Sequence, residues 1–181
     1  MARPSITSPA RYSGVSIGLH WLMLLLLAAV YALIQLRELY PRGSDPREAL
    51  KAWHFSMGLV VFGFAWLRIV VRVATSAPRR VSSLGDGLAL LAHLALYGLM
   101  IGMPLLGWMA LSAAGKPIPF FGLEVPALVS QDKVLASQFK EVHEVLGTVG
   151  YWLVGLHAVA ALVHHYLLKD DTLRRMLPRG A

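Results

Sequence analysis

The chain has 181 residues, of which 56% are hydrophobic and 15% are charged. A soluble domain averages about 25% charged residues, so this composition excludes a soluble globule and, because disorder needs low hydrophobicity, a disordered chain. It predicts one integral membrane domain over residues 1–181, and the net charge of +7 fits basic residues at membrane edges better than nucleic-acid binding. The absence of cysteine excludes disulfides, iron–sulfur clusters, cysteine-ligated zinc and covalently attached c-type haem.

Four apolar segments follow one another, at about residues 15–36, 54–74, 87–113 and 142–168. Each has about 20 residues or more, which at about 1.5 Å per residue crosses about 30 Å of hydrocarbon. The segments are continuously apolar, which predicts helices and not barrel strands. The first is too long for a signal peptide and reaches Arg37-Glu38 without a cleavage site, so we expect it to remain as a span. The predicted fold is an all-α membrane four-helix bundle.

The connections contain proline, glycine and charged residues, as in 41–46, 77–80 and 82–86. The longest, about residues 115–140, is expected to lie over the membrane surface as an amphipathic segment. With the N-terminus inside, one side of the membrane receives ten of the 17 basic residues but only three acidic ones, so the positive-inside rule places both termini in the cytoplasm. The ten are Arg3, Arg11, Arg68, Arg72, Arg79, Arg80, Lys169, Arg174, Arg175 and Arg179, and the three acids are Asp86, Asp170 and Asp171.

Seven histidines lie within or at the ends of the predicted spans. An ionisable side chain inside a membrane is costly and suggests a function, although a single histidine there serves packing at least as often. The inference therefore depends on the whole set. The seven are His20, His54, His93, His143, His157, His164 and His165.

Four of these histidines form two pairs by depth. His143 and His157 are 14 residues apart on the fourth segment, close to four helical turns, so they share one face about 21 Å apart. We expect His54 to begin the second span beside His143 on the outer side, and His20 to lie beside His157 in the cytoplasmic half. Two pairs of neutral imidazoles in a helical bundle suit two bis-histidine haem b groups.

Small residues line the same face of the fourth segment. Gly147 and Gly150 lie between the two predicted ligands, where they leave room for a flat macrocycle. Close helix–helix contact is the competing explanation, since small residues serve it in any membrane bundle. Arg68 follows His54 by 14 residues, which places it on one face with His54, either to pair with a haem propionate or to extend towards the headgroups.

The remaining polar candidates stay open between two roles. His93 on the third segment either hydrogen-bonds a propionate or packs. His164 and Lys169, near the inner membrane edge, donate to a quinone carbonyl, relay a proton, or belong to an ordinary interfacial belt.

Five segments resemble the bacterial cytochrome b561 family: Gly18-Leu19-His20-Trp21-Leu22, Lys51-Ala52-Trp53-His54, Arg68-Ile69-Val70-Val71-Arg72, Val142-His143-Glu144 and Gly155-Leu156-His157-Ala158. The resemblance covers nearly the whole chain. It implies a di-haem b protein of the bacterial inner membrane that exchanges electrons with the quinone pool. Some family members are superoxide:ubiquinone oxidoreductases, which implies superoxide as the periplasmic donor and ubiquinone as the acceptor. No catalytic residue follows from it.

Two other functions remain as alternatives. One is a cytochrome b anchor subunit that passes electrons from a periplasmic dehydrogenase or hydrogenase to quinone. The other is a haem-free helical protein, such as a small transporter, with histidines that serve protons or metal. Outer-side lysines either attract superoxide to the outer haem or are ordinary solvated loop residues; they are Lys51, Lys116, Lys133 and Lys140.

Overall fold

The computed structural model describes residues 11–75 and 84–177. Four long helices account for most of these residues: α1 (Gly14–Leu36), α2 (Asp45–Ala74), α3 (Leu84–Ala113) and α4 (Lys133–Tyr166). Each is long and apolar enough to span a membrane, and the predicted all-α membrane four-helix bundle is confirmed. The turn residues 77–80, 82 and 83 and four residues of the charge count, Arg3, Arg79, Arg80 and Arg179, lie outside the described ranges.

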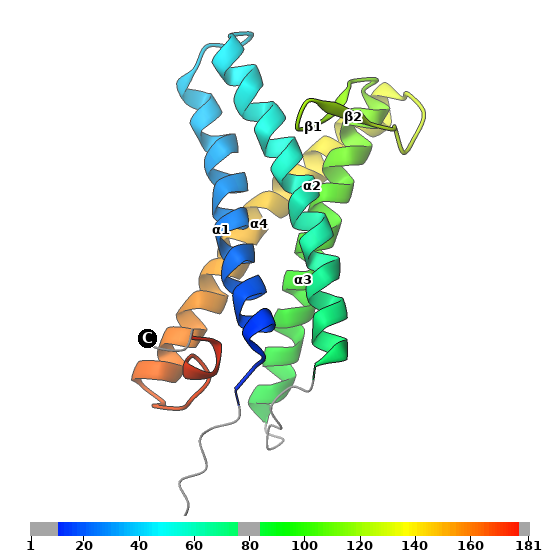
Figure 1. The fold of residues 1–181 in the computed structure, drawn as a ribbon. Coiled ribbons are helices and arrows are strands. Elements are labelled where there is room, and N and C mark those ends of the chain that lie inside the picture. Colours follow the sequence, from blue (N-terminus) through cyan, green and yellow to red (C-terminus); the bar gives the residue numbers. More distant parts are fainter. Residues whose placement is uncertain (1–10, 76–83, 178–181) are drawn as a thin grey trace, which may run out of the picture.

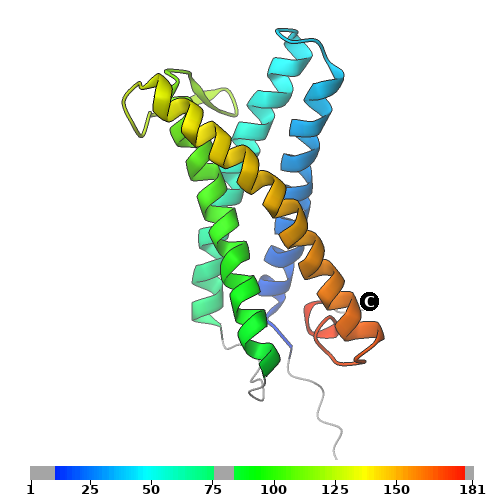
Figure 2. The same cartoon turned by 180° about the vertical axis from the view of Figure 1, so that it is seen from behind.

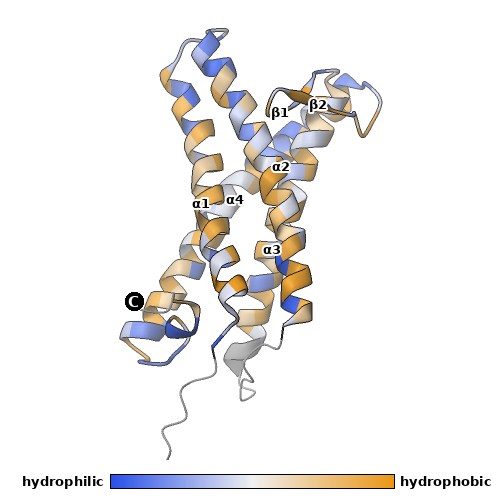
Figure 3. Cartoon of the chain, in the orientation of Figure 1, coloured by the Kyte–Doolittle hydropathy of each residue, from blue (hydrophilic) through white to orange (hydrophobic). Residues whose placement is uncertain are grey.

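The helices pack as two antiparallel pairs, α1 with α2 and α3 with α4, joined by contacts between α2 and α3. Helix α4 crosses the other helices at a steep angle (Figures 1 and 2). Hydrophobic residues cover the middle of the bundle and hydrophilic residues gather towards its ends (Figure 3). Many large apolar side chains face outward, such as Leu25, 67% exposed, and Trp152, 72% exposed. Such a surface requires lipid around it.

Two helices begin well before the predicted spans. Helix α2 starts at Asp45 after Ser44, and α4 starts at Lys133, where the Asp132 carboxylate accepts hydrogen bonds from the backbone N–H groups of residues 134 and 135. Hydropathy detects only the apolar part of a helix and not its charged first turns. His54 and His143 therefore lie more than two turns inside their helices, and the predictions that His54 begins the second helix and His143 the fourth were wrong.

The long connection of residues 115–140 is shorter and more ordered than predicted. It contains an antiparallel hairpin of β1 (Ile118–Phe120) and β2 (Leu123–Val125), with Ile118 opposite Val125. The turn has positive φ at Phe121 (50°) and Gly122 (87°). The hairpin lies beside α2 and α3 (Figure 1), and we call this the hairpin end of the bundle.

The two described ends of the chain meet at the opposite end, which we call the termini end. The Arg11 guanidinium donates to the backbone carbonyls of Arg174 and Leu177, both at 3.0 Å, and Trp21 Nε1 donates to that of Met176 at 2.8 Å. Residues 167–177, including the 3₁₀ turn Arg174–Met176, therefore form a strap from α4 back to the start of α1. Both described ends of the chain thus lie on one side; that this side is cytoplasmic stays a prediction.

A short clamp fixes the α1–α2 turn at the hairpin end. Arg47 is buried, although it is charged. It donates to the carbonyls of Arg37 and Tyr40 and makes a bidentate contact with Glu38 at 3.0 Å. Because Arg37 and Glu38 belong to the 3₁₀ turn Arg37–Leu39 after α1, this one guanidinium fixes the register between the first two helices.

Candidate haem-binding site

The structure brings the four predicted ligands together in two pairs. His54 of α2 faces His143 of α4 towards the hairpin end, with ring centroids 6.3 Å apart and an interplanar angle of 77°. His20 of α1 faces His157 of α4 towards the termini end, with centroids again 6.3 Å apart and an angle of 62°. We call these the hairpin-end pair and the termini-end pair. Helix α4 supplies one histidine to each.

This spacing is the one that two imidazoles on one metal atom require. A metal–imidazole bond of about 2 Å, plus about 1 Å from nitrogen to ring centre, on each side of the metal gives about 6 Å between centroids. No group of three or more His, Asp or Glu side chains that could hold a metal ion occurs within residues 11–75 and 84–177. Two imidazoles alone suit a metal that brings its other ligands, as haem does.

Hydrogen bonds orient the rings of the hairpin-end pair. His54 Nδ1 donates to the Val30 carbonyl of α1 at 2.9 Å, which leaves the lone pair of Nε2 available for a metal. His143 Nδ1 is buried and has no hydrogen-bond partner of normal geometry among the described residues, although the backbone of Met103 lies near it. A Cβ added at Gly107 would meet the His143 ring at 3.2 Å, so this glycine makes room for the imidazole.

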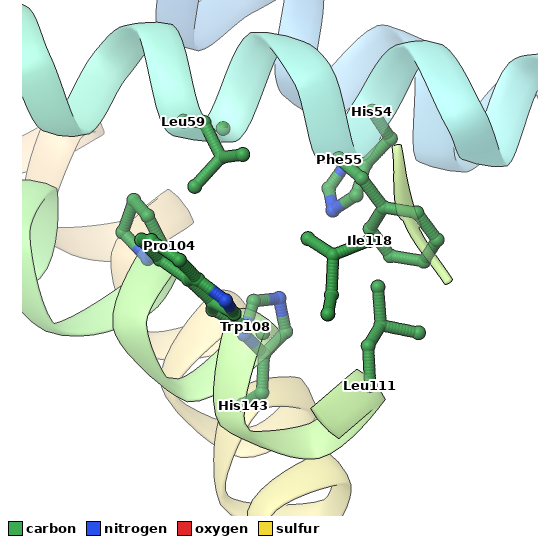
Figure 4. A pocket seen from close by; sticks show the side chains of 10 residues that line it. His54, Phe55, Leu59, Pro104, Trp108, Leu111, Ile118 and His143 are labelled. Atoms are coloured by element: carbon green, nitrogen blue, oxygen red, sulfur yellow. The ribbon is translucent and has the colours of Figure 1, made fainter. Parts of the chain in front are cut away.

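Apolar side chains surround the hairpin-end pair. Figure 4 shows the pocket into which His54 and His143 both point, with Pro104 and Trp108 on α3 and Ile118 at the start of the hairpin. Its remaining lining is also apolar: Phe55, Gly58, Leu59, Gly107 and Leu111. An apolar lining of this kind suits the faces of a porphyrin and would exclude water from a metal held between the two rings.

Charged and aromatic groups surround the termini-end pair. The Arg68 guanidinium donates to His20 Nδ1 at 3.3 Å and also lies 5.7 Å from the centre of the Tyr97 ring. The His93 ring lies 5.6 Å from that of His157, and its Nδ1 bonds to the Ala89 carbonyl of its own helix. The structure thus places two of the other predicted site residues, Arg68 and His93, beside this pair.

The other predicted site residues lie elsewhere. His164 Nδ1 contacts the Asp170 carboxylate at 2.5 Å, so this histidine closes the turn into the strap. Lys169 adopts a left-handed conformation in that turn, with φ of 54°. The predicted quinone or supporting set of His93, His164 and Lys169 is therefore divided between the termini-end pair and the strap.

The glycine stripe on α4 serves close helix contact at Gly150. A Cβ there would lie 2.2 Å from the Tyr31 hydroxyl and 3.1 Å from Leu99. That hydroxyl donates to the Gly147 carbonyl at 3.0 Å, and the Tyr31 ring lies 4.1 Å from that of Tyr151. Tyrosine fills the space next to Gly150, which favours the packing explanation over the macrocycle explanation at this position.

Sequence reasoning did not find several residues that shape the site. The Val30 carbonyl has no side-chain signal, because any residue provides one. Gly107 and Ile118 were visible as a small residue and an apolar residue, but no pattern linked them to His143. The fold, and not any motif, brings them beside the pair.

The structure is that of a multi-pass membrane protein in which two pairs of histidines face each other within the bundle. Comparison with known proteins agrees: the family described as prokaryotic cytochrome b561 matches residues 11–179. The chain belongs to this family of bacterial membrane b-type cytochromes of electron transfer.

Three relatives align with this chain over nearly the full length of both proteins. The Yersinia pestis protein named "Probable superoxide oxidase CybB" is 38% identical over 172 residues, 93% of this chain and 97% of the relative. Cytochrome b561 homolog 1 of Escherichia coli is 35% identical over 172 residues, 93% of this chain and 98% of the relative. Cytochrome b561 homolog 2 of the same bacterium is 30% identical over 178 residues, 96% of this chain and 95% of the relative.

Proposed function

We propose that the protein carries electrons across the membrane with two haem b groups, one held by each histidine pair. His54 and His143 would bind one haem, and His20 and His157 the other. When bound, haem b supplies a one-electron ferric–ferrous couple. The observation that carries this proposal is the common ring spacing of 6.3 Å in two pairs towards opposite ends of one bundle.

The protein groups around each pair have separate tasks in this proposal. The Val30 carbonyl holds the His54 ring in the tautomer that exposes Nε2. Arg68 offers a planar cation beside His20, suited to a haem propionate. Two imidazoles on each iron would leave no open position, so the electron donor and the quinone would react outside the metal's coordination sphere.

We assign superoxide as the donor and ubiquinone as the acceptor. The Yersinia pestis relative that is 38% identical is named a probable superoxide oxidase, which supports this donor. Two superoxide anions each lose one electron and become O₂, and one quinone gains two electrons and two protons to become quinol. Four outer-side lysines had two competing roles, attraction of superoxide or ordinary solvation. Two of them, Lys51 and Lys140, form salt bridges with Glu48 at 2.6 Å and Glu144 at 2.9 Å, which reduces their attraction for another anion.

The proposed location is the bacterial inner membrane, with the termini end in the cytoplasm and the hairpin end in the periplasm. The positive-inside rule supports this orientation. The described basic residues of the termini end are Arg11, Arg68, Arg72, Lys169, Arg174 and Arg175. Labelling of Leu123→Cys in intact spheroplasts by a membrane-impermeant maleimide tests it, because labelling only after lysis would reverse the orientation.

The decisive assay uses the purified chain with a superoxide source and a short-chain ubiquinone. We expect one quinol for every two superoxide anions consumed, with no added protein partner. No quinol formation by the isolated chain, together with activity restored by a periplasmic dehydrogenase or hydrogenase, would instead establish the anchor-subunit alternative. A superoxide scavenger added to the same mixture should abolish quinol formation. This controls for direct reduction of the quinone by the superoxide source.

A further inference from the structure

A buried serine attaches the hairpin to α2 next to a predicted haem ligand. Ser56 follows His54 by two residues and is 3% exposed. Its hydroxyl donates to the Pro119 carbonyl and accepts the N–H of Phe121, both at 3.2 Å. A helical serine usually bonds a carbonyl of its own helix one turn back, as Ser112 does with Trp108 at 2.8 Å. The Ser56 hydroxyl instead donates one hydrogen bond to the hairpin turn and accepts another from it.

These two bonds place Ile118 over the hairpin-end pair. Ile118 is 4% exposed, and its side chain lines the same pocket as His54 and His143 (Figure 4). The turn held by Ser56 includes Phe121, whose φ of 50° is unfavourable for a residue other than glycine. External contacts must offset that cost, and Ser56 provides two hydrogen bonds for the purpose.

A second attachment joins the following segment to α3, independently of Ser56. Trp108 Nε1 donates to the Pro126 carbonyl at 2.9 Å, and Ser112 Oγ accepts the N–H of Leu128 at 3.1 Å. The hairpin thus bridges two helices, with Ser56 on the α2 side. Because the α3 attachment does not use Ser56, loss of the Ser56 hydroxyl should free one side of the hairpin and leave the bundle assembled.

We propose that Ser56 is a positioning residue that holds the hairpin closed, with Ile118 as the plug of the hairpin-end pocket. The closed hairpin excludes bulk water and large electron donors from the side of the pocket that Ile118 covers. It thereby restricts this approach to small donors, which extends the proposed function to substrate size. The claim about the hairpin itself depends only on the contacts of Ser56 and Ile118.

The natural absence of cysteine makes this claim directly measurable. Single cysteines are placed at Ile118, in the pocket, and at Leu123, which is 70% exposed on the same hairpin. The haem-loaded protein is then treated with a polar maleimide in the absence of any electron donor. We expect Ile118→Cys to react much more slowly than Leu123→Cys. Equal rates would show that the hairpin does not close the pocket.

The Ser56 substitution completes the test. Adding Ser56→Ala should accelerate labelling of Ile118→Cys by about tenfold, the population change expected when two hydrogen bonds are lost, and leave Leu123→Cys unchanged. Ser137→Ala, an exposed serine bonded to its own helix, should have no effect and serves as the matched control. An unchanged Ile118→Cys rate in Ser56→Ala would overturn the positioning role.

A matched pair of variants covers the case in which Ser56→Ala does not assemble. Ser56→Thr and Ser56→Val have nearly the same shape and differ in the hydroxyl, so Thr should keep Ile118→Cys protected and Val should expose it. Equal labelling in the two would contradict the proposal. Because no substrate is present, these rates are independent of whether superoxide is the donor, and failure here is distinguishable from failure of the proposed function.

Discussion

The two histidine pairs share a ring spacing of 6.3 Å but differ in what holds their rings. His54 Nδ1 faces a carbonyl, which only accepts, so it carries the proton and leaves the Nε2 lone pair available. His20 Nδ1 faces Arg68, which only donates, so the proton of a neutral His20 lies on Nε2. His54 is therefore prepared to bind a metal through Nε2, whereas His20 must first release Arg68. Equal spacing of the rings therefore does not mean that each ring is held in the tautomer that a metal needs.

The largest expected effect is the loss of one haem when a histidine of either pair is replaced. His54→Ala and His143→Ala should lose the same haem, and His20→Ala and His157→Ala should lose the other, because each haem needs both of its imidazoles. A redox-titrated absorption spectrum of each variant identifies the missing component. His165→Ala, which changes a histidine outside both pairs, should retain both. If His20→Ala removed the component that depends on His143, the pairing would be wrong.

Arg68 should affect one pair and not the other. Arg68→Gln removes a cation beside His20 and should lower the midpoint potential of the termini-end haem by on the order of 50–100 mV, from the Coulomb energy of a charge about 8 Å away at an effective dielectric constant of about 20. Arg68→Lys should keep most of the potential. The hairpin-end potential should stay unchanged in both variants. An equal shift of both potentials would show a general change in the bundle instead.

The α1–α4 contact between the pairs should be sensitive to a single methyl group. In Gly150→Ala the added Cβ would overlap the Tyr31 hydroxyl, which should lower the free energy of unfolding by about 1–3 kcal/mol. Gly155→Ala is the matched control, because no atom lies within 4 Å of its added Cβ. Thermal unfolding in detergent compares the two. Equal melting temperatures would show that Tyr31 does not need the space at Gly150.

The two ends of the bundle should respond differently to acid. Partial burial raises the pKa of Asp170, but hydrogen bonds from His164 and Thr172 outweigh this and hold the pKa at about 2. Because folding lowers this pKa, ionised Asp170 stabilises the strap at pH values above the unfolded-state pKa of about 4. The stabilisation is lost as the pH falls towards 2. The hairpin contacts of Ser56 contain no such group.

Asp170→Asn should therefore loosen the strap already at neutral pH. Limited proteolysis should cleave residues 167–177 faster in this variant and leave cleavage of the hairpin unchanged. The difference should be small, because both Asp170 and His164 are more than a third exposed. Equal cleavage of the strap in the variant and the parent would remove Asp170 from the account of the termini end.

Continuous hydropathy was enough to predict the four spans, and the positions of the histidines along them predicted which ones share a depth. The 14-residue interval on α4 places His143 and His157 on one face whatever the other helices do. It could not show the Val30 carbonyl, the Tyr31 ring beside Gly150 or the Ser56 attachment. Each of these joins residues far apart in the chain, and their positions depend on helix crossing angles that no local pattern contains. The early starts of α2 and α4 were missed because charged turns have no hydropathy signal.

The central claim is that two facing pairs hold two haems. The direct measurement is the amount of haem b per chain in the purified protein, from the absorbance of extracted haem against protein determined by amino-acid analysis. The account predicts two haems per chain, and one in each of the four single histidine variants. A value of one or zero in the parent protein prepared with ample haem supply would contradict it.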